Sequence, residues 1–160
     1  MIRAFVMEAG RLRQVTGLKD LHEKVVWVDV VAPTHDEEAI IERWIGVGIP
    51  TREEMNEIEI SSRLYTENSA FFMTATLPAQ VGTTTQTMGP VTFVLARDRL
   101  VTVRYHEPRA FQTFPQRAET SDLNCTDGRT VLIGLLEAIV DRLADLLEIA
   151  SHDVIEMANQ

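Results

Sequence analysis

The chain has 160 residues and a formal net charge of −9, from 15 Lys and Arg against 24 Asp and Glu. This acidity argues against a nucleic-acid-binding protein, because contacts to phosphates need clustered Lys and Arg. With 45% hydrophobic residues the chain can bury a core and is not a disordered acidic tail. It has no apolar run near the roughly 20 residues of a membrane span, and its single cysteine, Cys125, excludes an intramolecular disulfide. These features predict a soluble domain of a reducing compartment.

The N-terminal segment predicts two strands. Residues 2–7 alternate apolar and polar side chains, which is typical of a half-buried strand. Residues 10–24 are polar and predict no strand. β-branched side chains crowd residues 25–31, which indicates a strand buried on both faces, near the centre of a sheet.

Two helix starts follow. Thr34 with Glu37, and Thr51 with Glu54, have the spacing of a capping box, in which each side chain bonds the free backbone N–H of the other residue. We expect a first helix to about Ile45 and a short second helix after Thr51.

Four further strands are expected as two hairpins. From residue 57 the apolar period changes to two, which predicts a hairpin to residue 77 with its turn at 66–69. Residues 78–90 are rich in Thr, Gly and Pro and predict a polar loop. Residues 91–105 predict a second hairpin around a turn at 97–99.

The C-terminal part is predicted to be helical. Pro108 suits the first turn of a helix through Arg117, residues 118–127 read as a loop, and residues 128–160 form one long helix. Its apolar face narrows along the helix to a single seam, which predicts that the helix leaves its own domain to meet another helix. The seam consists of Leu136, Val140, Leu143, Leu147, Ala150, Val154 and Met157, and Leu132, Ile139 and Leu146 form a second stripe beside it.

Strands that occur in blocks predict an α+β fold or mixed α/β/α layers, with a largely antiparallel sheet, and not a strictly alternating doubly wound fold. We expect an α/β domain over residues 1–127, with residues 128–160 as a long helix that packs on it.

Few residues have the spacing of a catalytic or metal site. The four histidines lie on different elements and have no metal-ligand spacing. Cys125 has no adjacent histidine motif, and the chain contains neither a phosphate-binding loop nor a nucleophile-elbow motif. The sequence therefore does not favour an enzyme.

Acidic residues are concentrated between residues 34 and 68, where nine acids stand against three bases. Solvated helix faces and first-turn acids that complement the helix dipole are the simpler explanation. The alternative is a site for a hard cation, which prefers carboxylate oxygens. Glu54 also belongs to a capping box. Glu137 interrupts the apolar face of the long helix, with Asp141 one turn further on.

Taken in order, several short segments resemble the N-terminal cytosolic domain of CorA-type magnesium and divalent-cation transporters, including the ZntB-like zinc transporters. The segments are VWVDV at 26–30, GIPTREEM at 48–55, FFMTAT at 71–76, VTFVL at 91–95, LVTVR at 100–104 and LLEAIVD at 135–141. The Gly-Met-Asn signature of the family's pore mouth is absent, as are both membrane spans and an acid expected from the later stalk helix.

The resemblance implies a domain on the cytoplasmic side of the bacterial inner membrane, whose mixed sheet is covered by helices and whose long helix starts a stalk. The full-length protein is expected to be a homopentameric channel that enters the membrane through a part beyond residue 160. The resemblance also implies regulatory divalent cations between subunits, Mg²⁺ first, with Co²⁺, Ni²⁺ or Zn²⁺ as alternatives. The family's regulatory acids fall on Glu54 and Glu53, and a second intersubunit position falls on Glu137. The alternative function is a soluble, non-enzymatic module that binds a partner helix.

Overall fold

The computed structural model describes residues 1–16, 21, 23–57, 59, 63–83 and 85–160 and contains one seven-stranded mixed sheet. The sheet order is β2-β1-β3-β7-β6-β5-β4, and β3 pairs with β7 in parallel whereas all other neighbours are antiparallel. The predicted α+β class with a largely antiparallel sheet is therefore confirmed. The elements are β1 (Ile2–Glu8), β2 (Arg11–Val15), β3 (Val25–Val31), α1 (His35–Ile45), α2 (Arg52–Glu57), β4 (Leu64–Glu67), β5 (Ala70–Val81), β6 (Thr85–Ala96), β7 (Arg99–Arg104), α3 (Ala110–Thr120) and α4 (Gly128–Ala158).

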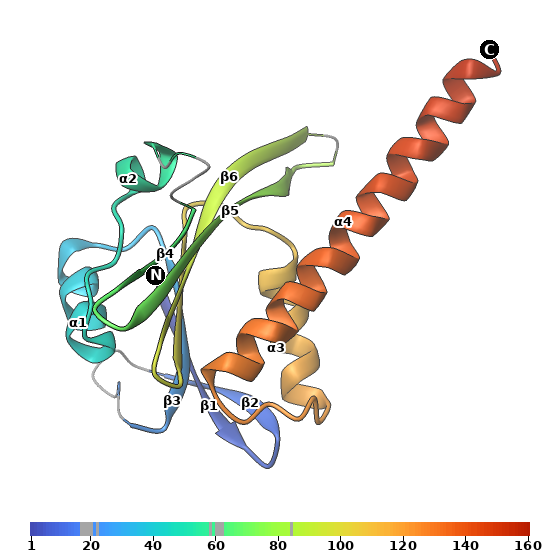
Figure 1. Cartoon of the computed structure of the whole chain (residues 1–160). Helices are drawn as coiled ribbons and strands as arrows, with labels where there is room; N and C mark the ends of the chain where they lie inside the picture. The colour runs from blue at the N-terminus through green and yellow to red at the C-terminus, as the bar shows by residue number, and fades with distance from the viewer. Residues whose placement is uncertain (17–20, 22, 58, 60–62, 84) are drawn as a thin grey trace.

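Helices cover both faces of the sheet, with α1 and α2 on one side and α3 and α4 on the other (Figure 1). Each face has its own core of buried apolar side chains. Strand β3 serves both cores, because Val28 and Val30 point to the α1 side while Trp27 points to the α3 side, all of them fully buried. The prediction of a central strand at residues 25–31 is confirmed.

Capping residues begin the helices as expected. Thr34 and Glu37 form the complete capping box of α1, which ends at Gly46 in the left-handed conformation. Asp127 caps α4 by accepting hydrogen bonds from the N–H groups of Arg129 and Thr130.

Three expectations about local structure were wrong. The polar segment 10–24 contains strand β2, an edge strand that buries only Leu12 and so lacks a strong apolar pattern. Helix α3 begins two residues later and ends three residues later than expected, at Thr120, so the loop after it is shorter.

The segment 78–90, expected to be a loop, instead extends the β5–β6 hairpin, with Pro78 opposite Met88 and Thr76 opposite Pro90. Proline is tolerated at positions 78 and 90 because neither proline pairs with a third strand on the side away from the hairpin partner. The β4 pairing reaches only to Met73, and the β7 pairing of β6 begins at Val91. The expected strand residues Ile58, Ile60 and Ser62 lie outside the described residues.

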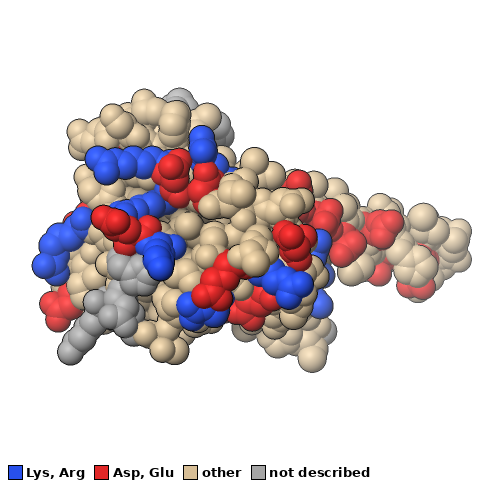
Figure 2. All heavy atoms as spheres, turned by 90° about the horizontal axis from the view of Figure 1, so that it is seen from below, with Lys and Arg blue, Asp and Glu red and all other residues tan. Residues whose placement is uncertain are grey.

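The long helix α4 packs only its first three turns on the domain. Its buried side chains are Val131, Leu135, Ala138 and Ile139, whereas the seam predicted from the sequence is largely exposed: Val140, Leu147, Val154 and Met157 are each more than 60% accessible. Beyond Arg142 the helix carries acidic residues and no Lys or Arg, which Figure 2 shows as red spheres along the projecting part. Within the described residues no helix is both long and apolar enough to cross a membrane.

The start of α4 lies unusually close to the β6–β7 turn. The N–H of Gly128 donates to the carbonyl of Asp98 at 2.7 Å, and a Cβ at Gly128 would lie 2.6 Å from the backbone nitrogen of Leu100. Only glycine fits this approach, because backbone atoms cannot move aside as a flexible side chain can.

We therefore expect Gly128→Ala to lower the free energy of unfolding by about 1–3 kcal/mol through overpacking, measured by urea denaturation. Gly48→Ala is the matched control, since its Cβ would meet nothing closer than 3.9 Å. Equal unfolding midpoints for the two variants would contradict the close approach.

Candidate functional site

The short helix α2 presents the first two predicted metal-binding residues. The N–H of Glu54 donates to Thr51 Oγ1 at 3.2 Å, and the Thr51 hydroxyl donates to Glu54 Oε1 at 3.2 Å. The carboxylate thus accepts from the Thr51 hydroxyl, not from the backbone N–H that a complete capping box would use. Glu53 and Glu54 are both exposed, so most of their oxygen lone pairs face solvent.

Glu53 and Glu54 affect the pKa values of different tyrosines. Burial raises the pKa of Tyr65, and Glu67 and Glu54 raise it further through their charges. Burial also raises the pKa of Tyr105, to which Glu38 and Glu53 add. Adjacent residues of a helix point about 100° apart, so Glu53 and Glu54 face different neighbours and do not converge on one point.

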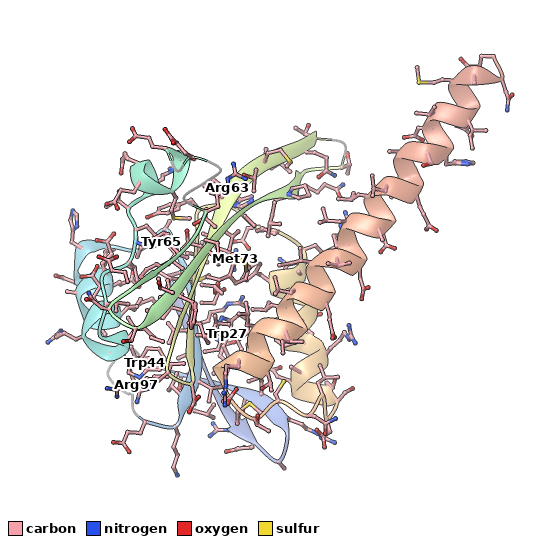
Figure 3. The ribbon with its side chains drawn as sticks, viewed as in Figure 1. Trp27, Trp44, Arg63, Tyr65, Met73 and Arg97 are labelled. Atoms are coloured by element: carbon pink, nitrogen blue, oxygen red, sulfur yellow. The ribbon has the colours of Figure 1, made fainter. Side chains whose placement is uncertain are left out.

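Glu137 lies on the opposite face of the sheet from α2. Tyr65 stacks on Phe72, which belongs to the core on the α1 side, whereas Met73 packs with the core under α3 and α4. Figure 3 shows Tyr65 and Met73 on opposite sides of β5. Glu137 is exposed on α4 and lines a cleft of about 200 Å³ with Arg117 and Cys125. The sheet therefore separates Glu137 from Glu53 and Glu54.

No cluster of three or more His, Cys, Asp or Glu side chains that could hold a metal occurs among the described residues. The predicted metal contacts Glu53, Glu54 and Glu137 remain single exposed carboxylates within one chain. Their role as ligands stays a prediction.

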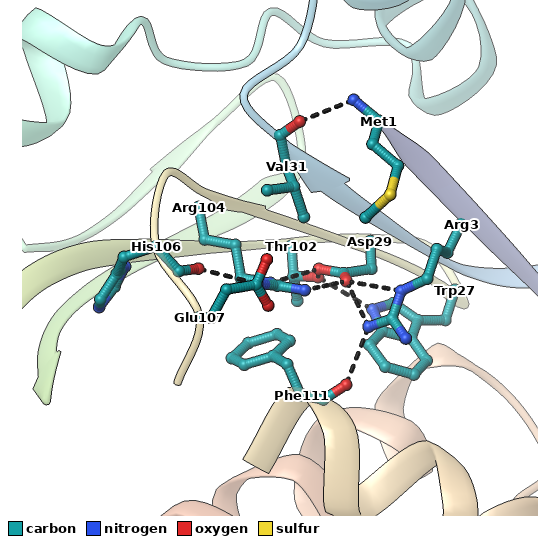
Figure 4. Close-up of polar contacts among 10 residues, drawn as sticks. All are labelled: Met1, Arg3, Trp27, Asp29, Val31, Thr102, Arg104, His106, Glu107 and Phe111. Atoms are coloured by element: carbon teal, nitrogen blue, oxygen red, sulfur yellow. Dashed lines mark hydrogen bonds and ion pairs between the residues drawn. The ribbon is translucent and has the colours of Figure 1, made fainter. Parts of the chain in front are cut away.

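Sequence reasoning missed a network of charges buried at the sheet centre (Figure 4). The Asp29 carboxylate is fully buried and accepts from Arg3 Nη2 at 2.7 Å, from Arg104 Nη2 at 2.8 Å and from the Thr102 hydroxyl at 2.8 Å. Arg104 Nη1 also donates to Glu107 at 2.8 Å. The sequence contained a signal for this network, because Asp29 is a charged residue inside the apolar run 25–31 and its burial requires partners.

The same network supports α3. Pro115 lies inside this helix and has no N–H, so the carbonyl of Phe111, four residues earlier, has no helical donor. Arg3 Nη2 donates to this carbonyl at 2.8 Å. The guanidinium of Arg3 thus joins the sheet to the helix.

Arg104 stays charged in this environment. Burial lowers the pKa of its guanidinium, but hydrogen bonds and ion pairs with Asp29, and then with Glu107, outweigh burial and raise the pKa above its ordinary value. The network is consequently ionic, and each charge in it depends on the others.

The other candidate groups are structural or exposed. Cys125 is 3% accessible, and burial together with Asp122 raises the pKa of its thiol, which opposes nucleophilic chemistry. His35 and His152 are exposed beside glutamates of their own helices, and a ring nitrogen of His106 bonds the Leu77 carbonyl. His22 lies outside the described residues.

Comparison with known proteins identifies relatives over nearly the whole chain. The model of a family described as "CorA-like Mg2+ transporter protein" matches residues 22–159. The magnesium transport protein CorA of Pasteurella multocida is 25% identical over 155 residues, which cover 96% of this chain and 49% of the relative. The magnesium transport protein CorA of Wolinella succinogenes is 31% identical over 133 residues, which cover 81% of this chain and 41% of the relative. The chain spans about half the length of the curated relatives it matches.

Solved structures share the fold. The soluble domain of CorA from Methanocaldococcus jannaschii superposes with a TM-score of 0.68 at 13% identity, covering 99% of this chain and 63% of that one. The ZntB cytoplasmic domain from Vibrio parahaemolyticus gives a TM-score of 0.65 at 14% identity, and the superposition covers 96% of this chain and 63% of that one.

The buried network makes a prediction about stability. Asp29→Ala leaves the buried charge of Arg104 without its main partner, and we expect a loss of about 3–5 kcal/mol in the free energy of unfolding, measured by urea denaturation. Glu107→Ala is the control, because Glu107 is 54% exposed and its loss costs less than about 1 kcal/mol. Similar losses in both variants would refute the central role of Asp29.

The burial of Cys125 makes a second prediction. Because its thiol is inaccessible and its pKa is raised, we expect a thiol-specific disulfide reagent to react at pH 7 at least about tenfold more slowly with the folded chain than with the urea-unfolded chain. Equal rates would show that Cys125 is open and reactive.

Proposed function

The chain belongs to the CorA-like Mg2+ transporter family, and from this we propose that it forms the cytosolic regulatory domain of a divalent-cation transport channel, with no catalytic role. We assign Mg²⁺ as the first ion, with Co²⁺, Ni²⁺ or Zn²⁺ as alternatives, and place the domain on the cytoplasmic side of the bacterial inner membrane. The observation that carries the proposal is the family match over residues 22–159, which includes both α2 and α4.

The regulatory ions would bind between chains. Mg²⁺ requires about six oxygen ligands, whereas Glu53, Glu54 and Glu137 stand as separate exposed carboxylates on two faces of the domain. Acids of a neighbouring chain would supply missing ligands, and retained water the others. A homo-oligomer, a pentamer in the full-length protein, provides such neighbours, with one position at Glu53 and Glu54 and a second at Glu137.

Helix α4 would transmit occupancy of these positions toward the membrane part. A bound cation offsets the repulsion between carboxylates of neighbouring chains, and its loss restores that repulsion. Because α4 carries Glu137 on a turn packed on the domain and then projects beyond it (Figure 1), a shift at the domain would move the far end of the helix.

A second candidate function is a soluble module that binds a partner helix. An exposed apolar seam on α4 favours it, because no described residue covers the side chains of Val140, Leu147, Val154 and Met157. The coding sequence beyond Gln160 separates the two functions. Two apolar runs of about 20 residues there would support the channel, and a stop codon directly after Gln160 would exclude it.

Mg²⁺ should stabilise the folded chain through Glu54. A ligand that binds only the folded state raises stability by mass action, so we expect millimolar MgCl₂ to raise the melting temperature at constant ionic strength. Glu54→Gln keeps the size of the side chain and its bond with Thr51, and should reduce the increase by at least about half.

Glu119→Gln is the matched control, since Glu119 is an exposed acid of α3 on the other face of the sheet. It should keep the full increase. If MgCl₂ stabilises the wild type, Glu54→Gln and Glu119→Gln equally, Glu54 is not a ligand.

A further inference from the structure

A second cleft lies between α3 and α4, away from α2. It has a volume of about 300 Å³, within the range of small-ligand sites. Its floor is Ala138, which packs in the core between the two helices. Helix α3 contributes Thr113 and Arg117, the residue before it contributes Arg109, and α4 contributes Asp141, Arg142 and Asp145.

The arginines of this cleft have no ion-pair partner in the part of the chain that the structure describes. Arg109, Arg117 and Arg142 form no ion pair with any described residue, although two aspartates line the same cleft. The Thr113 hydroxyl, midway between Arg109 and Arg117, likewise has no described hydrogen-bond partner. Elsewhere in the chain Arg3, Arg104 and Arg129 all bind carboxylates directly.

The two sides of the cleft differ in charge: the α3 side carries two arginines, whereas the α4 side carries two aspartates and Arg142. Arg109 and Arg117 are eight residues apart, roughly 12 Å along the helix, with Thr113 halfway. Across the cleft, Asp141 and Asp145 are one turn apart on α4. Among the described residues no ion pair joins the arginines of one side to the aspartates of the other. The cleft therefore suits a ligand that carries both a negative and a positive part.

We propose that this cleft binds a phosphate-bearing anion together with Mg²⁺. Guanidinium groups recognise phosphate oxygens with paired hydrogen bonds, which assigns the phosphate to Arg109, Arg117 and the Thr113 hydroxyl. Mg²⁺ is commonly held by one or two carboxylates plus the phosphates of its ligand, which assigns the ion to Asp141 and Asp145. This site shares no carboxylate with the proposed regulatory positions, because Glu53 and Glu54 lie on the other face of the sheet and Glu137 lines a different cleft.

Titration calorimetry with pyrophosphate, with and without MgCl₂ at constant ionic strength, tests the proposal on the 160-residue chain. We expect saturable binding that MgCl₂ strengthens. Arg117→Gln removes charge-assisted hydrogen bonds and should weaken binding about tenfold or more. Asp145→Asn should keep the binding seen without Mg²⁺ and lose the strengthening by Mg²⁺.

Arg43→Gln is the matched control, since it removes one exposed arginine from α1 on the opposite face and should bind like the wild type. Binding of neither pyrophosphate nor phosphatidic acid vesicles, or equal weakening by Arg43→Gln and Arg117→Gln, would overturn the site. A parallel sedimentation assay with vesicles of phosphatidylcholine and phosphatidic acid identifies the source of the phosphate. Vesicle binding that Arg117→Gln abolishes, in the absence of pyrophosphate binding, would assign the site to a lipid headgroup.

Discussion

Asp29 is a charge placed at the centre of the sheet, and its ion pairs with Arg3 and Arg104 determine how the neighbouring elements assemble. An unpaired buried carboxylate is strongly unfavourable, so β1 and β7 must place their arginines on either side of β3. Arg3 then donates to the carbonyl that Pro115 leaves unsatisfied in α3. One carboxylate thus couples three strands and the helix on which α4 packs.

This arrangement gives the two faces of the sheet different roles. The α1 side presents the exposed acids of α2, whereas the α3 side orients α4 through close contacts. A Cβ at Gly128 would lie under 3 Å from backbone atoms, and a Cβ at Gly134 would lie under 3 Å from the Phe114 ring. Because α4 is held firmly only over its first turns, its acidic distal half stands clear of the domain (Figure 2). The exposed acids of α2 and the projecting half of α4 are therefore held by the same sheet, on its two faces.

Local signals predicted most of the fold. The capping box at Thr34, the dense apolar strand at 25–31 and the final helix depend on neighbouring residues, which a sequence displays directly. Strand β2 and the hairpin extension over 78–90 are polar and form through pairing with another strand, so the local sequence pattern did not predict them. The buried partners of Asp29 come from positions up to 75 residues away. The roles of Glu53, Glu54 and Glu137 depend on chains that a single sequence does not place in space.

The central claim is that divalent cations bind between copies of this domain, and sedimentation velocity in MgCl₂ and in EDTA at equal ionic strength tests it most directly. Ligands shared by two chains favour the assembled form by mass action. The account predicts a larger sedimenting species in MgCl₂ that dissociates in EDTA. The same monomer in both conditions, while calorimetry records one Mg²⁺ bound per chain, would contradict it.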